Sequence, residues 1–313
     1  MTTIDLGPRI GLIGDAHGNH LFLQEAAIQL ADRGCTSLVQ LGDFGLVWDR
    51  SNQQSLAQQK VHEVLELVGL TIHVVLGNHE NYDEIELMDA DEHGVRWLNS
   101  RIAILPRSGI TIVDAGQHSK HRIGWLSGAA SVDRSARTPG LSWWPQEIPS
   151  DADCEALLSG AAQAPVDVLL AHEALATPGL VARLAKNAGM WGAADLRYAN
   201  YSQQEFTGRA LQVFAQDRRA LVVSGHYHFR HSEEAELQSP DGRLVPVRQE
   251  ILEMEWNHGS VAVLDMPGNT ARPELDVFGV SQHNVWSRHA RLRRACKQNR
   301  MSEDRLAQAL SIE

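Results

Sequence analysis

Short apolar runs alternate with longer amphipathic stretches through the first half of the chain. Residues 10–13, 38–41 and 72–76 are short runs rich in Val, Ile and Leu, which is typical of buried strands. Residues 21–33 carry apolar side chains at helical spacing and stop before Gly34, and residues 53–68 do the same before Gly69. This order predicts a βαβαβ unit, and therefore a parallel sheet with functional side chains at the carboxyl ends of its strands.

The second half of the chain mixes short strands with further helices. Residues 102–126 predict three strands, with turns at Pro106, Gly109 and Gly116. Further apolar runs lie at 166–170 and 221–223, and we expect helices over 151–162, 177–188 and 202–217 and a β-rich stretch over 219–264. The pattern therefore predicts one α/β domain over residues 1–267, with a charged and helical C-terminal tail over 268–313.

Aspartate, asparagine and histidine residues follow five of the apolar runs. The motifs are Gly14-Asp15-Ala16-His17, Gly42-Asp43, Gly77-Asn78-His79-Glu80, His172-Glu173 and Gly225-His226-Tyr227-His228. Side chains at strand ends are held by the rigid sheet while their tips reach into a cleft. Their oxygen and nitrogen atoms are suited to two divalent metal ions.

In this order the five motifs resemble the calcineurin-like metallophosphoesterase superfamily. Its pattern is Asp-x-His, Gly-Asp, Gly-Asn-His-Glu/Asp, His and Gly-His-x-His, and the match covers roughly residues 8–265. The resemblance implies a four-layer α/β/β/α sandwich, in which helices flank two mixed β-sheets. It also implies a metal-dependent phosphoesterase with two metal ions at the strand ends.

The resemblance also implies which side chains bind each ion. One site contains Asp15, His17, Asp43 and His228, and the other contains Asp43, Asn78, His172 and His226. Two cations roughly 3.5–4 Å apart need a shared anionic ligand, so we expect Asp43 to bridge them. Mixed oxygen and nitrogen donors favour Mn, with Fe, Zn and Ni as alternatives.

The expected chemistry follows from charge. A water shared by two cations has a pKa lowered toward neutrality, so hydroxide is available to attack phosphorus in line with the leaving oxygen. His79 is next to a ligand and is the non-ligand histidine of the resembled family. Its expected role is to protonate the leaving group or to stabilise the phosphoryl oxygens.

A single histidine in a sequence is more often a hydrogen-bonded core residue than a metal ligand, and a single Gly-Asp is usually a turn. Here His17, His172, His226 and His228 all fall in motifs whose spacings agree with one another. That agreement favours ligation for these four of the 15 histidines and for none of the others.

A long loop over residues 127–150 separates the Asn78 motif from the His172 motif. Long ordered loops on a scaffold are often functional. Arg134 and Arg137 are expected to contact a substrate phosphate, because guanidinium groups form paired hydrogen bonds with its oxygens. Trp143 and Trp144 either stack on a base or anchor the loop. A loop of this type resembles a subset of bacterial and phage metallophosphoesterases.

Composition limits the partners. The net charge of −11 argues against binding long nucleic acid, although a metal cleft still suits small phosphorylated substrates, including nucleotides. The three separated cysteines, the absence of a signal-peptide pattern and the absence of a long apolar run predict a cytoplasmic protein without a membrane span. No feature of the sequence indicates an oligomeric state.

The tail carries a basic cluster followed by acidic residues. The cluster comprises Arg288, Arg291, Arg293, Arg294, Lys297 and Arg300. It is interpreted first as a solvated helix face. The alternatives are docking on the acidic body, self-association and contact with RNA.

Two other functions compete with small-molecule phosphoester hydrolysis. Serine/threonine phosphoprotein phosphatases share the first and third motifs, but they carry Asp-Arg-Gly where this chain has Leu46-Val47-Trp48. The aspartate that would partner the catalytic histidine is therefore missing. A non-catalytic binding scaffold on the same fold usually lacks some ligands or the histidine, and this chain lacks none of them.

Overall fold

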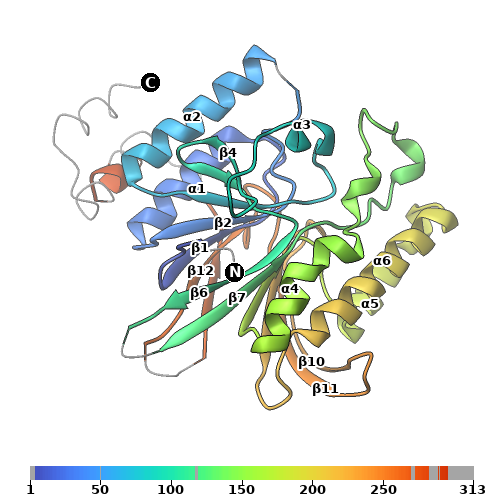
Figure 1. Ribbon diagram of the computed structural model, residues 1–313. Helices are drawn as coiled ribbons and strands as arrows, with labels where there is room; N and C mark the ends of the chain where they lie inside the picture. Colours follow the sequence, from blue (N-terminus) through green and yellow to red (C-terminus); the bar gives the residue numbers. More distant parts are fainter. Residues whose placement is uncertain are drawn as a thin grey trace.

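Two mixed β-sheets pack face to face with helices on their outer faces (Figure 1). The computed structural model describes residues 4–49, 51–116, 119–268, 272–281, 288 and 290–294. The seven-stranded sheet has the order β13-β12-β1-β2-β3-β5-β4, and the six-stranded sheet has the order β10-β11-β9-β8-β7-β6. The predicted α/β/β/α sandwich is confirmed.

The first sheet consists of β1 (Arg9–Ile13), β2 (Ser37–Leu41), β3 (Ile72–Val75), β4 (Arg96–Asn99), β5 (Ile102–Ile104), β12 (Val261–Asp265) and β13 (Glu274–Phe278). The second consists of β6 (Ser108–Asp114), β7 (Lys120–Leu126), β8 (Val168–Ala171), β9 (Ala220–Ser224), β10 (His231–Gln238) and β11 (Leu244–Ile251). The α-helices are α1 (His20–Asp32), α2 (Asn52–Val68), α3 (Tyr82–Glu86), α4 (Asp151–Gln163), α5 (Pro178–Ala185) and α6 (Ala193–Gln212).

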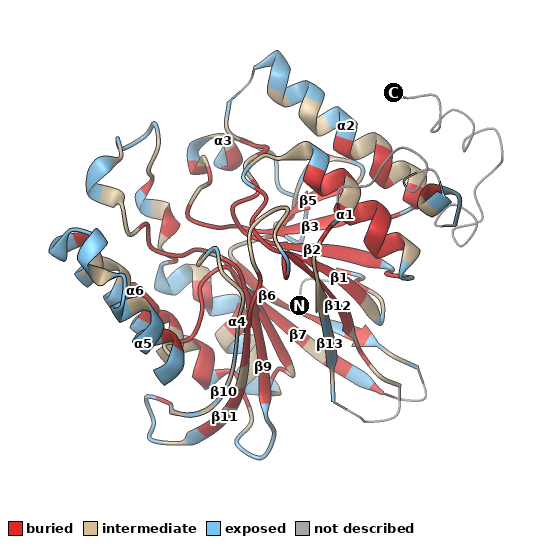
Figure 2. Ribbon diagram, turned by 180° about the vertical axis from the view of Figure 1, so that it is seen from behind, coloured by how far each residue is buried: buried red, intermediate tan, exposed pale blue. Residues whose placement is uncertain are grey.

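The central strands are buried on both faces (Figure 2). In β3, Val75 packs between the sheets while its neighbour Val74 packs under α1 and α2. In β8, Val168 packs between the sheets while Leu169 packs under α4 and α6. Alternate side chains of a strand point to opposite faces, so a strand with two covered faces is apolar throughout its length. This is why the strands appear in the sequence as continuous apolar runs.

The predicted βαβαβ unit is confirmed, since β1, β2 and β3 pair in parallel. In the second sheet β7, β8 and β9 are also parallel. The three strands expected over 102–126 are β5, β6 and β7. Gly109 lies inside β6 rather than at a turn, because the Trp125 ring covers it and a Cβ there would lie 2.2 Å from that ring.

The helix α6 differs in extent from the prediction, and two short elements were not predicted. The helix α6 begins at Ala193, nine residues before the expected start at 202. Its first turns are largely exposed and therefore show no apolar stripe in the sequence. The helix α3 and the strand β4 are short elements that the apolar pattern did not predict.

The tail differs from a wholly helical extension. The expected boundary at 267 falls before β13, which pairs antiparallel with β12 at the edge of the first sheet. Residues 288 and 290–294 are helical and dock on α1, where Arg288 pairs with Glu25 at 2.9 Å and Arg294 with Asp32 at 2.7 Å. Leu292 is buried there. This part of the basic cluster thus docks on the acidic body, while Lys297 and Arg300 lie outside the described residues.

Within the described ranges, none of the helices combines the length and the apolar character needed to cross a membrane.

Candidate metal centre

The five motifs follow the carboxyl ends of five strands and meet at one place. Asp15 and His17 follow β1, Asp43 follows β2, and Asn78 follows β3. From the second sheet, His172 follows β8, and the Gly225–His228 motif follows β9. Parallel strands carry their carboxyl ends to the same edge of a sheet, so packing two such sheets brings the motifs of both together.

Sharp backbone turns direct these side chains into the centre. Five described residues other than glycine have a positive φ, and four belong to the motifs: His17 (44°), Asp43 (54°), His226 (75°) and His228 (52°). This conformation costs roughly 1–2 kcal/mol per residue, so it persists where the surrounding structure imposes it. Strain concentrated in this way is typical of a functional site.

The motif glycines are needed because ligand side chains pass directly over them. A Cβ on Gly77 would lie 2.2 Å from Asp43 Oδ1, and one on Gly225 would lie 2.1 Å from Asp15 Oδ1. Any larger residue would displace the aspartates. The glycines therefore belong to the metal centre although they offer no ligand atom.

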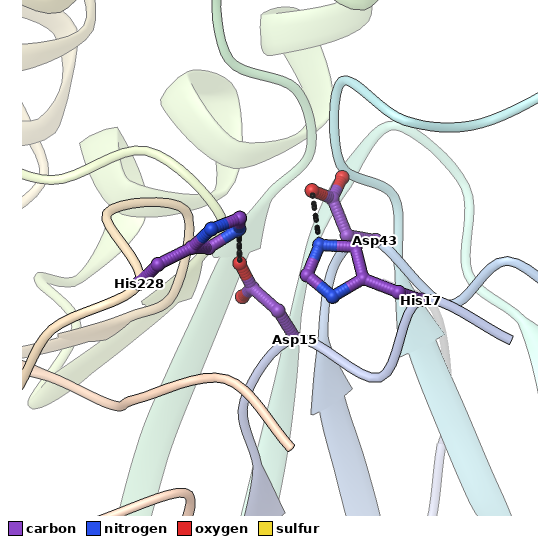
Figure 3. A group of neighbouring side chains, drawn as sticks. All are labelled: Asp15, His17, Asp43 and His228. Atoms are coloured by element: carbon purple, nitrogen blue, oxygen red, sulfur yellow. Dashed lines mark ion pairs between the residues drawn. The ribbon is translucent and has the colours of Figure 1, made fainter. Parts of the chain in front are cut away.

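Four of the expected ligands form a compact group. One ligand atom from each of Asp15, His17, Asp43 and His228 lies within 4.8 Å of the others (Figure 3). His228 Nε2 is 3.2 Å from Asp15 Oδ2, and His17 Nε2 is 3.6 Å from Asp43 Oδ2. Both aspartates are buried, and Asp43 Oδ2 accepts no hydrogen bond from any described residue. A buried carboxylate oxygen without a donor fits a bound cation.

The remaining ligands converge beside this group. His172 Nδ1 donates to the carbonyl oxygen of Leu41 at 2.7 Å, so the lone pair of its neutral tautomer lies on Nε2. That nitrogen faces Asn78 Oδ1 at 3.0 Å and Asp43 Oδ1 at 3.2 Å. Three acceptor atoms therefore point at one another, an arrangement that requires a shared cation or proton. The centroid of the His226 ring lies 5.0 Å from the centroid of the His172 ring.

His79 lies beside the centre rather than in it. Its backbone N–H donates to Asp43 Oδ1 at 2.8 Å. Its ring contacts the guanidinium of Arg137, with both nitrogen–nitrogen distances at 2.9 Å. Arg137 is held in turn by Asp133, whose carboxylate oxygens lie 2.7 and 2.9 Å from its Nε and NH2. The 127–150 loop thus places the positive charge of Arg137 next to the candidate metal centre.

A family model for the calcineurin-like phosphoesterases matches residues 8–230. The chain belongs to this family. The family and the Asp/His cluster together indicate a divalent metal site.

Three solved structures are similar to this calcineurin-like phosphoesterase over most of its length, at low identity. A dimetal phosphatase from Danio rerio is 14% identical, with 89% of this chain and 98% of that chain covered and a TM-score of 0.46. TT1561 of Thermus thermophilus is 13% identical, with 87% and 99% covered and a TM-score of 0.43. GAP50, the anchor in the inner membrane complex of Plasmodium, is 12% identical, with 91% and 94% covered and a TM-score of 0.41. A search of the curated proteins finds no significant match.

The 127–150 loop also fixes the orientation of Asn78. Asn78 Nδ2 donates to Ser131 Oγ at 3.0 Å, which turns Asn78 Oδ1 toward His172. Ser131 donates to the buried Glu147 through its backbone N–H at 3.0 Å and its hydroxyl at 2.5 Å. Tyr198 of α6 donates to the same carboxylate at 2.8 Å. Partners of this kind hold a ligand in a single orientation.

Sequence reasoning missed Ser131 and Glu147, and it also missed Glu255. Glu255 Oε2 lies 3.0 Å from His17 Nδ1, an arrangement that leaves His17 Nε2 facing Asp43. Nothing local marks these residues, because they meet their partners only after the chain has folded.

The two loop arginines occupy different positions. Arg137 lines a pocket that lies beside the candidate metal centre, whereas Arg134 does not line it. The Arg134 guanidinium lies 4.0 Å from the Tyr198 ring centroid and 5.7 Å from that of Trp143. These contacts tie the loop to α6, and contact of Arg134 with substrate stays a prediction.

The paired tryptophans face different surroundings. Trp144 is 2% exposed, donates from Nε1 to Asp83 at 2.8 Å and packs edge-on against Trp48. This is the anchoring alternative. Trp143 contacts Arg134, and neither tryptophan is among the residues that line the pocket.

Protons occupy the centre when metal does not. Burial opposes the charged form of both histidines, but Asp43 and Glu255 raise the pKa of His17 to about 10. Asp43 and Asp15 likewise raise the pKa of His172 to about 9. The pKa of Asp43 stays well below its usual range despite burial, because His172 and His79 lie close to it. At pH 7 the metal-free centre therefore carries protons on both histidines.

We expect metal binding at pH 7 to release about two protons per chain, because imidazole ligands must be neutral to bind. The release should decline as the pH rises through about 9 to 10, where the free histidines lose these protons without metal. Calorimetric titration with Mn²⁺ in buffers of different ionisation enthalpy measures the number. The exposed His93→Ala should release as many protons as the natural chain. Binding without proton release at pH 7 would contradict the assignment of both histidines.

Proposed function

We propose that this chain is a binuclear metal-dependent phosphoesterase that hydrolyses a phosphodiester or nucleotide-like ester. The observation that carries the proposal is the convergence of His172 Nε2, Asn78 Oδ1 and Asp43 Oδ1, with hydrogen bonds that turn the histidine and the asparagine inward. Three acceptors that converge in this way need a cation or a proton between them, and a divalent ion satisfies all three at once.

The two donor sets share Asp43. Asp15, His17 and His228 would bind one ion with Oδ2 of Asp43, and Asn78, His172 and His226 would bind the other with Oδ1. Mixed oxygen and nitrogen donors accept Mn, Fe, Zn and Ni, and of these Mn²⁺ is the ion that we propose. When bound, the pair would supply a hydroxide nucleophile at neutral pH and offset the charge of the phosphate. The protein keeps the ligands oriented through Leu41, Ser131 and Glu255.

His79 and Arg137 act together in this proposal. Arginine has only donors, so at least one of the two His79 nitrogens that face it must be an unprotonated acceptor, and the ring is therefore neutral. Burial and the nearby Arg137 lower the pKa of His79, although Asp43 opposes them. Bound cations would lower it further. We infer that the pair donates hydrogen bonds to the phosphoryl oxygens, one of the two roles expected for His79.

The competing functions find less support. Leu46 and Val47 stand where phosphoprotein phosphatases carry their Asp-Arg-Gly, and both are buried in the apolar core. That core leaves no acid to partner His79 from this segment. A scaffold without activity would not need the strained ligand residues to be retained.

The function is tested by metal content and turnover measured on the same preparation. The Mn²⁺-loaded protein should hydrolyse at least one of an aryl phosphodiester, a phosphomonoester and the 2′,3′- and 3′,5′-cyclic nucleotides. Removal of metal by a chelator should abolish turnover, and added Mn²⁺ should restore it. Tight binding of two metal ions without hydrolysis of any ester would favour the scaffold.

Changing the loop arginines one at a time should separate their roles. Arg137→Ala should lower kcat/KM by about 10- to 100-fold, because it removes charge-assisted hydrogen bonds at the phosphate. Arg134→Ala should instead lower the melting temperature by about 2 °C, since it loses only its contacts with aromatic rings. Kinetics and thermal melting of both variants check this. If the two variants lost activity equally, the loop would have only a structural role.

A further inference from the structure

A pocket opens directly from the proposed metal centre. Its volume is about 470 Å³, and Asn78, His79, His226 and His228 form one wall. The opposite wall comes from α5, from the 3-10 helix Ala188–Met190 that follows it, and from α6. The helices α5 and α6 cover the second sheet and carry exposed outer faces (Figure 2). A group attached to a phosphate at the metals would extend into this pocket.

The opposite wall includes two large apolar side chains that belong to none of the hydrophobic core clusters of the described residues. Met190 is 74% exposed and Trp191 is 41% exposed, and neither belongs to a hydrophobic core cluster. Leu184 and Phe229 continue this surface toward the metal side. An exposed tryptophan beside a catalytic group is suited to stacking on a flat ring.

The same wall carries amide groups. Asn187 and Asn200 line the pocket and are exposed, and their side chains form no hydrogen bond with any described residue. Gln203 also lines the pocket, but its amide is fixed, because its Nε2 donates a hydrogen bond to the Tyr227 hydroxyl at 2.7 Å. That hydroxyl donates in turn to Glu173 at 2.6 Å. Each free amide offers both a donor and an acceptor. A ring with polar edges would use these groups, whereas a plain hydrocarbon would not.

The charge of the pocket argues against additional phosphates. Of the described residues that line it, Asp133, Glu173 and Arg137 are the acidic and basic ones. Arg137 is the single cation, and it is already paired with Asp133. A second phosphate would therefore meet no cation beyond the metals and Arg137, which the first phosphate already engages.

We propose that this pocket binds the organic part of the substrate, a flat aromatic group with hydrogen-bonding edges that carries a single phosphate. The proposal rests on the proposed phosphoesterase function and specifies its substrate class. A nucleoside and a simple aryl alcohol share the flat ring, and the amides of Asn187 and Asn200 distinguish them. Nucleoside diphosphates and triphosphates should be poorer substrates than the corresponding single-phosphate esters.

A matched series of esters tests the proposal on the Mn²⁺-loaded protein. Ethyl phosphate, benzyl phosphate and adenosine 5′-phosphate all release primary alcohols, so they differ mainly in the group that enters the pocket. Each is used as the monoester and as its methyl diester. Benzyl esters should exceed ethyl esters in kcat/KM by about tenfold or more, because a ring is buried. Adenosine esters should exceed benzyl esters.

Two variants and a control locate the effect. Trp191→Ala should reduce the benzyl-to-ethyl preference about fivefold, mainly through KM. Asn200→Ala should reduce the adenosine-to-benzyl preference and leave the benzyl-to-ethyl preference in place. Tyr201→Ala is the matched control, since Tyr201 is an exposed aromatic residue of α6 that does not line the pocket. It should behave as the natural chain.

The outcomes separate the two proposals. If no ester is hydrolysed, including an activated aryl diester, the phosphoesterase function itself fails. If ethyl and benzyl esters are hydrolysed equally well, and Trp191→Ala changes nothing, the function stands and the aromatic pocket is refuted. Equal rates for benzyl and adenosine esters, unaffected by Asn200→Ala, would refute the polar edges alone.

Discussion

Asp43→Asn is expected to lower both metal occupancy and phosphoesterase activity by orders of magnitude. Asp43 is the ligand common to both proposed donor sets, since Oδ1 faces His172 and Oδ2 faces His17. An asparagine of the same shape offers one neutral oxygen and one NH2 group, so it cannot bridge two cations. Loss of the anionic bridge leaves the repulsion between the ions uncompensated, and at least one ion should be lost.

The Asp43→Asn measurement combines metal analysis by mass spectrometry with turnover of an aryl diester. Circular dichroism and thermal melting show whether the variant is folded. Asp167→Asn is a suitable control, because Asp167 lies just before β8, at the opposite end of the strand that leads to His172. The control should retain two metal ions and full turnover. Two ions and near-normal activity in Asp43→Asn would show that Asp43 is not the bridge.

The strands and their end residues could be predicted because their pattern is local. A strand covered on both faces must be apolar over its whole length, so β1, β2 and β3 are visible as short runs. The motifs directly after them contain glycines, and the structure explains why: at Gly77 and Gly225 the ligand side chains occupy the place of a Cβ. Strand, glycine and ligand therefore appear together in the sequence.

Residues that meet only through the fold could not be predicted. Ser131 and Glu147 orient Asn78, and Glu255 orients His17, yet no spacing links them to these ligands. The pocket wall is similar, since it depends on α6, whose exposed first turns show no apolar stripe.

The different roles of neighbouring residues in the 127–150 loop could not be predicted from the sequence either. Arg134 and Arg137 are three residues apart, and side-chain type alone does not distinguish them. The 3-10 turn of Arg134–Ala136 directs Arg134 toward Tyr198, whereas Arg137 follows the turn in an extended conformation and reaches His79. Trp143 and Trp144 likewise differ only because adjacent residues in extended backbone face opposite ways.

His79→Ala is expected to retain metal while kcat falls by roughly 10²–10³, the range for loss of one hydrogen-bond donor that stabilises charge on the reacting group. His79 supplies a backbone N–H to Asp43, which alanine keeps, so the ligand set should remain intact. The ring is what is lost, together with its contact to Arg137. The exposed His93→Ala is the control and should show no change in kcat.

Esters with different leaving groups distinguish the two possible roles of the His79 ring. A neutral ring keeps one N–H that can donate a hydrogen bond, but it is too weak an acid to transfer that proton. We therefore expect Mn²⁺-loaded His79→Ala to lose similar factors on nitrophenyl and alkyl esters. A far larger loss on the alkyl ester, which needs protonation of its oxygen, would instead establish His79 as the general acid.

A double-mutant cycle of His79→Ala with Arg137→Ala adds an independent measurement. If the two residues stabilise the phosphoryl oxygens as a unit, the double variant should lose much less than the product of the single losses. Fully multiplicative losses would mean that His79 and Arg137 act separately.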